Sequence, residues 1–203
     1  MVNREYYLEY LKKTDKFPQS VYHKVKHDIA GSMFGLLAPQ ALVLDAGCGI
    51  GNITAEYCPG YTIIGIDEQF SSIEYCKQNC AGKYIQSSLY NVPFKDNVFD
   101  SIFFLDAIEH LKDPLLALKE LARVLKPKAS ILICTMNYAS PLWLILENTW
   151  HRFFAGSCKP YSKDVHPTPY TEKILKQHCN NFFKEIRLEK RIMGMELFYI
   201  GKK

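Results

Sequence analysis

The chain has 203 residues, of which 48% are apolar, and a formal net charge of +4, which predict one globular domain with a sizeable core. No apolar run approaches the ~18 residues of a membrane span, and residues 1–17 lack the apolar core of an export signal, so we expect a cytoplasmic protein. The basic residues are dispersed and the seven cysteines form no CxxC pair, so we expect no nucleic-acid partner, zinc site or disulfide framework.

Residues 1–137 carry the most regular patterns. Helices are expected at 3–13 and 20–37, and we group residues 1–38 as an N-terminal helical cap. Residues 40–137 then alternate apolar runs with helical segments. Strands are expected at 41–47, 61–67, 83–88, 98–106 and 130–137, and helices from about 52, at 71–80 (capped by Ser71 or Ser72) and at 114–125. Apolar strands that alternate with helices predict a parallel sheet covered on both faces.

The rest of the chain is expected to cover a ligand and to extend the sheet. Residues 138–170 are irregular but place apolar residues on one helical face, and ligands of doubly wound folds bind beyond the carboxyl ends of the strands, so we expect a substrate lid. Residues 171–203 are expected to form a helix and an antiparallel hairpin. The predicted fold is a single α/β domain, Rossmann-like and doubly wound. Its mostly parallel seven-stranded sheet has an antiparallel C-terminal hairpin and helices on both faces.

The stretch "VLDAGCGIGNIT", residues 43–54, joins the first predicted strand to a glycine-rich turn. The dinucleotide fingerprint GxGxxG, counted from Gly47, would need a third glycine at Asn52. Asp45 would repel a pyrophosphate but would suit a ligand that carries positive charge. Asp67 ends the second strand, where a carboxylate can accept the hydroxyl groups of a ribose. S-adenosylmethionine, a nucleoside with a sulfonium and an ammonium group but no phosphate, fits both acids.

The chain resembles the class I S-adenosylmethionine-dependent methyltransferases of small molecules. Residues 43–54 are similar to the first motif of that family, and "IIGIDEQFSSIEYCKQN" is similar to its second. "SSLYNVPFKDNVFDSIFFLDAIEHLKDP" resembles the third and fourth motifs, and "LKELARVLKPKASILICTMN" resembles the helix and strand that follow them. The resemblance covers about residues 40–137, so we treat this segment as the cofactor-binding core. It implies S-adenosylmethionine as the cofactor and a strand hairpin at the sheet edge.

The turn chemistry and the resemblance together give a set of expected cofactor contacts. The glycines allow the backbone to approach the methionyl part, Asp45 orients that end through the turn, and Asp67 holds the ribose. The complete expected set is Asp45, Gly47, Cys48, Gly49, Gly51, Asp67, Glu68, Ser88, Leu89 and Leu105. Two positions depart from the family pattern. Ser88 replaces the aspartate that holds the adenine amino group, and Lys128-Ala129 replaces a glycine pair, so we expect a turn of different shape there.

The segment "FLDAIEHL" holds the candidate catalytic residues Asp106, Glu109 and His110. Their i, i+3, i+4 spacing would place all three on one face of a helical turn. His110 could act as a general base for a hydroxyl acceptor. The trio could instead bind Mg²⁺, as the similar stretch of the ubiquinone-pathway O-methyltransferases suggests, or could only line the pocket. Metal binding is the least favoured of these interpretations, and we assign no metal ligand.

These observations favour methyl transfer from S-adenosylmethionine to a small or medium-sized acceptor, at oxygen or nitrogen. The alternative is a non-catalytic S-adenosylmethionine-binding or interaction protein that retains the fold. NAD-dependent reduction and RNA methylation are weaker rivals, because of Asp45 and the dispersed charge. Among the other histidines, His166 could reach the substrate, whereas His23 and His27 are expected on a solvated helix face. The identity of the acceptor and the oligomeric state do not follow from the sequence.

Overall fold

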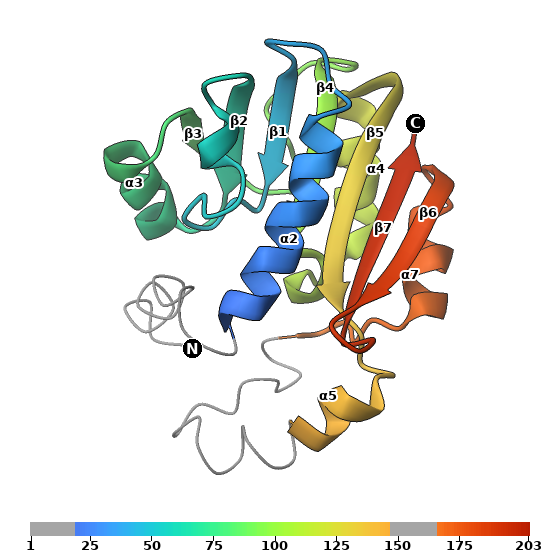
Figure 1. Ribbon diagram of the computed structural model, residues 1–203. Helices are drawn as coiled ribbons and strands as arrows, with labels where there is room; N and C mark the ends of the chain where they lie inside the picture. Colours follow the sequence, from blue (N-terminus) through green and yellow to red (C-terminus); the bar gives the residue numbers. More distant parts are fainter. Residues whose placement is uncertain (1–18, 147–165) are drawn as a thin grey trace.

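The computed structural model describes residues 19–146 and 166–203 (Figure 1). The helix expected at 3–13 and residues 147–165 of the expected lid lie outside these ranges. The seven strands are β1 (Leu42–Ala46), β2 (Thr62–Asp67), β3 (Lys83–Gln86), β4 (Phe99–Leu105), β5 (Leu125–Met136), β6 (Lys184–Arg191) and β7 (Glu196–Lys202). The helices are α2 (Gln19–Phe34), α3 (Phe70–Asn79), α4 (Pro114–Val124), α5 (Pro141–Leu146) and α7 (Glu172–Cys179), with 3-10 turns η1 (Ala55–Tyr57) and η2 (Ile108–His110).

All seven strands form one sheet in the order β3-β2-β1-β4-β5-β7-β6. The pairings from β3 to β5 are parallel, whereas β7 runs antiparallel to both β5 and β6. The predicted fold class, a Rossmann-like sheet with an antiparallel C-terminal hairpin, is therefore confirmed. No helix in the described ranges is long and apolar enough to cross a membrane.

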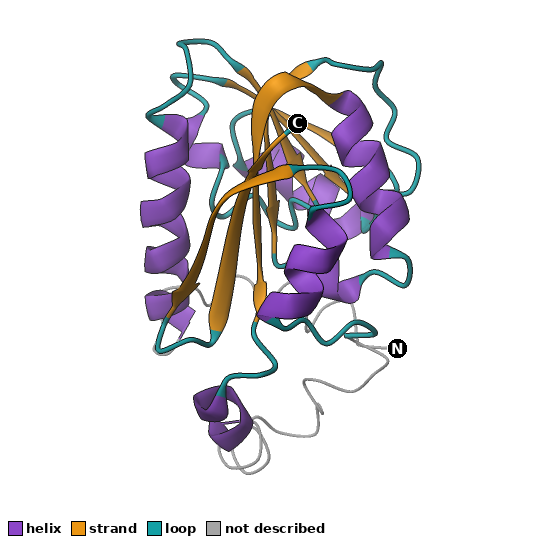
Figure 2. Ribbon diagram, turned by 90° about the vertical axis from the view of Figure 1, so that its right-hand side faces the viewer, coloured by secondary structure: helices purple, strands orange, loops and turns teal. Residues whose placement is uncertain are grey.

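The sheet separates two layers of helices, as Figure 2 shows, with α2 on one face and α4 and α7 on the other. Successive strand residues alternate between the two cores: Val43 and Phe103 pack with α2, while Leu44 and Phe104 pack on the opposite face. Because both faces are covered, the strands are apolar along most of their length. The first turns of α2 lie at the edge where β1 and β4 end (Figure 1).

The helix expected from about residue 52 is the main error in the predicted elements. The structure has only the single 3-10 turn η1 there, followed by Pro59 and Gly60. Too few residues separate the glycine turn from β2 for a longer helix, and Pro59 and Gly60 end any helical pattern. The expected caps of α3 are also wrong, because its N-cap is Gln69 and the hydroxyls of Ser71 and Ser72 have no hydrogen-bond partner in the described part of the chain.

Lys128 lies in the irregular first part of β5 and has a backbone conformation typical of glycine. Lys128 has a φ of 66°, and its N–H donates to the carbonyl of Lys203 at 3.1 Å. The expected difference in shape from the family's glycine pair stays a prediction. The lysine takes the left-handed conformation, which costs a residue with a Cβ atom about 1–2 kcal/mol.

Candidate functional site

The glycine turn lies directly after β1, at the edge of the sheet where β1, β2 and β4 end (Figure 1). Gly47, Gly49 and Gly51 have φ angles of 69°, 51° and 73°, a region that is costly for residues with a Cβ atom. Gly47 is constrained a second time, because a Cβ atom there would lie 2.6 Å from the Cβ of Ala107, in the loop after β4. The turn therefore packs closely against the loop after β4, and the expected approach of its backbone to a cofactor stays a prediction.

Asp67, at the end of β2, forms a hydrogen bond that holds the glycine turn beside this strand. Its Oδ2 accepts a hydrogen bond from the N–H of Gly49 at 2.9 Å, and its Oδ1 accepts one from the N–H of Gln69 at 2.8 Å. Burial raises the pKa of Asp67, and the two N–H donors oppose that rise. A carboxylate offers about four lone-pair positions, so it can accept ribose hydroxyls in addition to these two bonds. Asp67 is therefore suited to hold both the turn and a ribose.

Asp45 stabilises the turn from the inside. Its side chain is 5% exposed and accepts a hydrogen bond from the hydroxyl of Thr54, which is buried. Burial raises the pKa of Asp45 to about 7; the hydrogen bond from Thr54 opposes this rise and the charge of Asp67 adds to it. Asp45 thus contacts the far end of the same turn, a geometry that suits the expected indirect orientation of a ligand.

Three thiols lie beneath the turn, an arrangement that the sequence analysis missed. Cys76 donates to the carbonyl of Gly49 at 3.3 Å, Cys80 donates to that of Ile50 at 3.3 Å, and Cys48 donates to Gly49 at 3.7 Å. A hydrogen bond with Cys76, together with burial, raises the pKa of Cys48, so its thiol stays protonated. The i, i+4 spacing of Cys76 and Cys80 was the available signal, although α3 ends at Asn79 and Cys80 is the extended residue that follows it.

The other expected cofactor residues follow the ends of β2, β3 and β4. Ser88 lies after β3, and its hydroxyl oxygen accepts a hydrogen bond from the backbone N–H two residues further on, at 3.3 Å. Leu89 is buried beside the first glycine of the turn. Glu68 is exposed, and Leu105 is half-buried at the end of β4. All ten expected cofactor residues therefore lie at the same edge of the sheet, because the strands that precede them are parallel.

The expected catalytic trio does not share one helical face. Asp106 has a φ of 50° and precedes η2, which is a single 3-10 turn. Glu109 is 1% exposed and accepts a hydrogen bond from the hydroxyl of Thr135 at 2.9 Å, whereas His110 is exposed. Burial raises the pKa of Glu109 to about 8, and the charge of Asp106 adds to this rise. The three residues lie at the expected edge of the sheet, but each meets a different environment.

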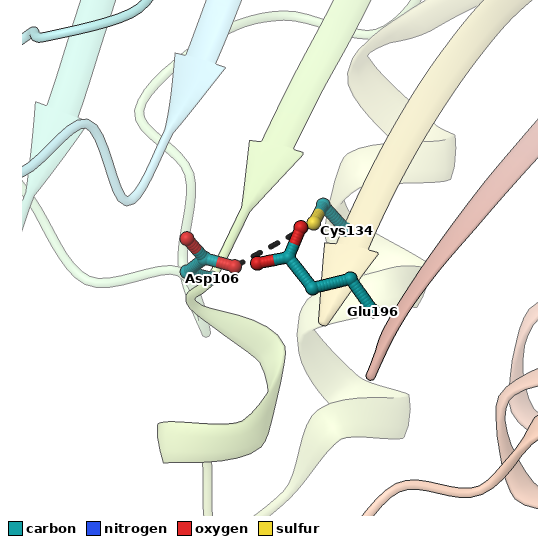
Figure 3. Close-up of side chains that lie close together, drawn as sticks. All are labelled: Asp106, Cys134 and Glu196. Carbon is teal, nitrogen blue, oxygen red and sulfur yellow. Dashed lines mark hydrogen bonds between the residues drawn. The ribbon is translucent and has the colours of Figure 1, made fainter. Parts of the chain in front are cut away.

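Asp106 and Glu196 point toward each other beside Cys134, as Figure 3 shows. The possible metal-ligating atoms of these three residues lie within 4.8 Å of one another. Lys26, from α2, supplies a positive charge to this group: its Nζ donates to Oδ2 of Asp106 and lies 3.0 Å from Oε1 of Glu196. The Cys134 thiol donates to Oδ1 of Asp106 at 3.5 Å. The ammonium group of Lys26 therefore occupies the position beside Asp106 and Glu196 that a metal ion would need.

This ionic cluster is buried. Lys26 is 6% exposed and Glu196 is 1% exposed. Burial disfavours the charge of Lys26, but Asp106 and Glu196 outweigh it and raise the pKa of Lys26 well above its ordinary value. Burial also raises the pKa of Glu196 to about 7, against the influence of Lys26. Oε2 of Glu196 has no hydrogen-bond partner within residues 19–146 and 166–203. Asp106 and Glu196 thus share one ammonium group, that of Lys26.

His110 and His166 form an edge-to-face ring pair near the end of β4. The rings of His110 and His166 have centroids 4.5 Å apart and planes at 75°. His166 is buried, and its Nδ1 is hydrogen-bonded to the hydroxyl of Tyr138; burial lowers its pKa to about 3, so the ring is neutral at physiological pH. His23 was expected to be solvated but is half-buried, and burial followed by the charge of Lys26 lowers its pKa to about 4.

Comparison with known proteins gives consistent matches. Residues 44–133 match the family described as "Methyltransferase domain". The chain is 28% identical over 128 residues to the ubiquinone/menaquinone biosynthesis C-methyltransferase of Geotalea daltonii, covering 58% of this chain and 54% of that one. It is 27% identical over 124 residues to the ubiquinone biosynthesis O-methyltransferase of Escherichia fergusonii, covering 57% and 49%. A crystal structure of a Pyrococcus horikoshii protein superposes with a TM-score of 0.74 at 17% identity, covering 98% and 99%.

The sheet order and the glycine turn define the fold of the class I methyltransferases. Residues 44–133 of this chain are homologous to the S-adenosylmethionine-dependent members of that class, among them small-molecule methyltransferases of quinone biosynthesis. The chain spans about half the length of the curated relatives it matches. S-adenosylmethionine is the methyl donor that this family implies.

Proposed function

We propose that this protein transfers the methyl group of S-adenosylmethionine to a small or medium-sized molecule, at oxygen or nitrogen. The observation that carries the proposal is the glycine turn after β1. It lies at the edge of the sheet where β1, β2 and β4 end, and the N–H of Gly49 in this turn donates a hydrogen bond to Asp67. The turn offers the close backbone approach and Asp67 the carboxylate that the methionyl and ribose parts of the cofactor need. The homology of residues 44–133 gives independent support.

Different residues of the chain would bind different parts of the cofactor. Bound S-adenosylmethionine supplies a methyl group that its sulfonium already activates. Asp67 would hold the ribose, Ser88 and Leu89 would face the adenine, and Leu105 would border the reacting methyl group. Asp45 would act through the turn. The remaining tasks of the protein are to align the acceptor with the methyl group and to exclude water.

Transfer to a hydroxyl or an amine releases a proton, which a nearby side chain must accept. His110 is the exposed member of the trio and lies against His166 at the end of β4. Asp106 is half-buried beside it, whereas Glu109 is bonded to Thr135 inside the core. We therefore assign His110 as the base that receives the proton, with Asp106 at the pocket wall and Glu109 as a positioning residue.

Methyl transfer can be tested without knowledge of the acceptor. The protein is incubated with S-adenosylmethionine labelled in its methyl group and with fractionated small molecules from a cell extract. The expected result is a labelled product that carries one additional methyl group on oxygen or nitrogen, located by NMR spectroscopy. Asp67→Ala is the matched control, which should form no product. A product methylated on carbon would contradict the assigned acceptor atoms, while leaving the transfer itself in place.

A non-catalytic binding protein is the second candidate, and one observation favours it. Asp106 is bonded to Lys26, and Glu109 is bonded to Thr135, so two of the three candidate catalytic residues already serve the structure. A binding protein would give a calorimetric signal with S-adenosylmethionine but no labelled product in any fraction. Under methyl transfer, His110→Ala should lower turnover at least tenfold while cofactor affinity is kept.

A further inference from the structure

Lys26 connects α2 to the loop after β4, which packs against the glycine turn. Its side chain is buried, although it belongs to a helix that precedes the cofactor-binding core in the sequence. The Nζ atom is bonded to Asp106, 80 residues away, and lies 3.0 Å from Oε1 of Glu196. The side chains that Lys26 holds therefore come from the end of β4 and the start of β7. A solvent-exposed lysine of α2 could not make these contacts.

The neighbours of Lys26 lead directly to the cofactor turn. Asp106 has a φ of 50°, a backbone conformation that a non-glycine residue rarely keeps unless its surroundings hold it there. The next residue is Ala107, whose Cβ would lie 2.6 Å from a Cβ atom on Gly47. The position of Asp106 thus fixes the position of Ala107, and Gly47 packs against Ala107. A displacement of Asp106 would therefore move the side chain that Gly47 contacts.

The charge of Lys26 is needed because the carboxylates around it repel each other. Asp106 and Glu196 point toward each other in Figure 3, and Glu109 adds a third acid nearby. Glu196 is 1% exposed, so water cannot screen this repulsion effectively. Without Lys26, the side chains of Asp106 and Glu196 would lose the ammonium group that both of them contact, and Asp106 belongs to the loop beside Gly47.

We propose that Lys26 is a positioning residue of the cofactor site: through Asp106 and Ala107 it holds the β4 loop against Gly47 and so sets the affinity for S-adenosylmethionine. This inference rests on the proposed function, because it takes the glycine turn as the cofactor site. It assigns α2 a part in cofactor binding although no residue of α2 belongs to the expected cofactor contacts.

The test compares Lys26→Met with Lys24→Met, since Lys24 is exposed on the same helix. Isothermal titration calorimetry with S-adenosylmethionine, well below the unfolding temperature, should give at least tenfold weaker binding for Lys26→Met and an unchanged affinity for Lys24→Met. In an Asp106→Asn background, Lys26→Met should add little, because both changes act through one contact. A purely structural role would lower the melting temperature without changing the affinity of the folded protein. Equal affinities of Lys26→Met and wild type would overturn the proposal.

Two further measurements keep the outcome decisive. If Lys26→Met does not fold, Lys26→Met combined with Glu196→Gln removes one repelling carboxylate along with the ammonium; weakened binding supports the proposal, and normal binding refutes it. NMR spectra of the protein without cofactor should show shifted amide signals of Gly47 and Ala107 in Lys26→Met and not in Lys24→Met. If the wild type binds no S-adenosylmethionine, the proposed function fails, while these amide shifts still decide whether Lys26 positions the turn.

Discussion

Gly47 and Ala107 lie so close that a single methyl group added to Gly47 would come within 2.6 Å of the Ala107 side chain. This contact joins the turn after β1 to the loop after β4. Gly47→Ala must therefore both push the β4 loop away and strain a backbone with a φ of 69°. We expect it to destabilise the fold by ~2 kcal/mol or more and to weaken S-adenosylmethionine binding at least tenfold. Chemical unfolding and calorimetry measure the two effects.

Gly194→Ala is the control that separates strain from steric overlap. Gly194 has a φ of 83° in the β6–β7 hairpin, and nothing lies within 4 Å of an added Cβ atom. It should cost only about 1 kcal/mol of stability and leave cofactor affinity unchanged. Equal loss of affinity in both variants would mean that the contact between Gly47 and Ala107 does not matter for binding.

Ser88 stands where the family resemblance leads us to expect an aspartate, and its hydroxyl accepts a backbone hydrogen bond at 3.3 Å. A carboxylate could keep that bond and accept a stronger, charge-assisted one from the adenine amino group. Ser88→Asp should therefore tighten S-adenosylmethionine binding about fivefold. Ser87→Asp, one residue away, should not. An unchanged or lower affinity of Ser88→Asp would show that Ser88 does not face the adenine.

Lys128 carries a left-handed backbone conformation on a residue with a Cβ atom. Glycine adopts this conformation without that penalty, but it also gains more freedom in the unfolded chain. The balance predicts that Lys128→Gly raises the free energy of unfolding by roughly 0.5–1 kcal/mol. Lys128→Ala, which removes the charge but keeps the Cβ atom, should not stabilise the protein. Denaturant titration of the two variants would contradict this account if both were stabilised equally.

The buried acids should make the free energy of unfolding fall as the pH rises from about 4 to 8. Burial raises the pKa of Asp45 and Glu196 to about 7 and that of Glu109 to about 8. The folded state therefore holds protons that the unfolded state releases at lower pH, and stability declines as pH rises from about 4 toward 8. Three of the described histidines, His23, His166 and His178, oppose this trend only below about pH 6.5, because burial lowers their pKa values.

The window for the test is therefore pH 6.5 to 8.5, above the range in which the lowered histidine pKa values affect stability. The melting temperature should fall across it by a few degrees, with Glu109 contributing up to about 2 kcal/mol. Glu109→Gln should flatten the slope. Glu74→Gln, which changes an acid whose side chain is 42% exposed, should leave the slope unaltered. A melting temperature that rises steadily over this window would contradict the raised pKa values of these buried acids.

The sheet and the cofactor turn were predictable from the sequence because their signals are local. An apolar strand followed by "DAGCGIG" predicts a tight turn at one edge of a parallel sheet, and the position of Asp67 at the next strand end follows from alternation. The helix after the turn could not form, since the few residues before Pro59 do not allow one. The short distance to Pro59 was also visible in the sequence, but we gave more weight to the glycine motif, which a helix usually follows.

The ionic cluster could not be predicted, because its members meet only in the folded chain. Asp106 and Glu196 are 80 and 170 residues from Lys26, and no spacing rule relates residues so far apart. One signal existed: Lys26, Ala30 and Met33 lie at i, i+4 and i+7 and are all buried, so a lysine interrupts the apolar stripe of α2. A lysine at such a position indicates a buried carboxylate partner.

The central claim is that the glycine turn and Asp67 bind S-adenosylmethionine, and calorimetry tests it most directly. The wild-type protein should bind S-adenosylmethionine at one site per chain with micromolar affinity, Asp67→Ala should bind it at least tenfold more weakly, and NAD should give no binding signal. The absence of a signal with S-adenosylmethionine at millimolar concentration, or equal binding by Asp67→Ala and wild type, would contradict the account.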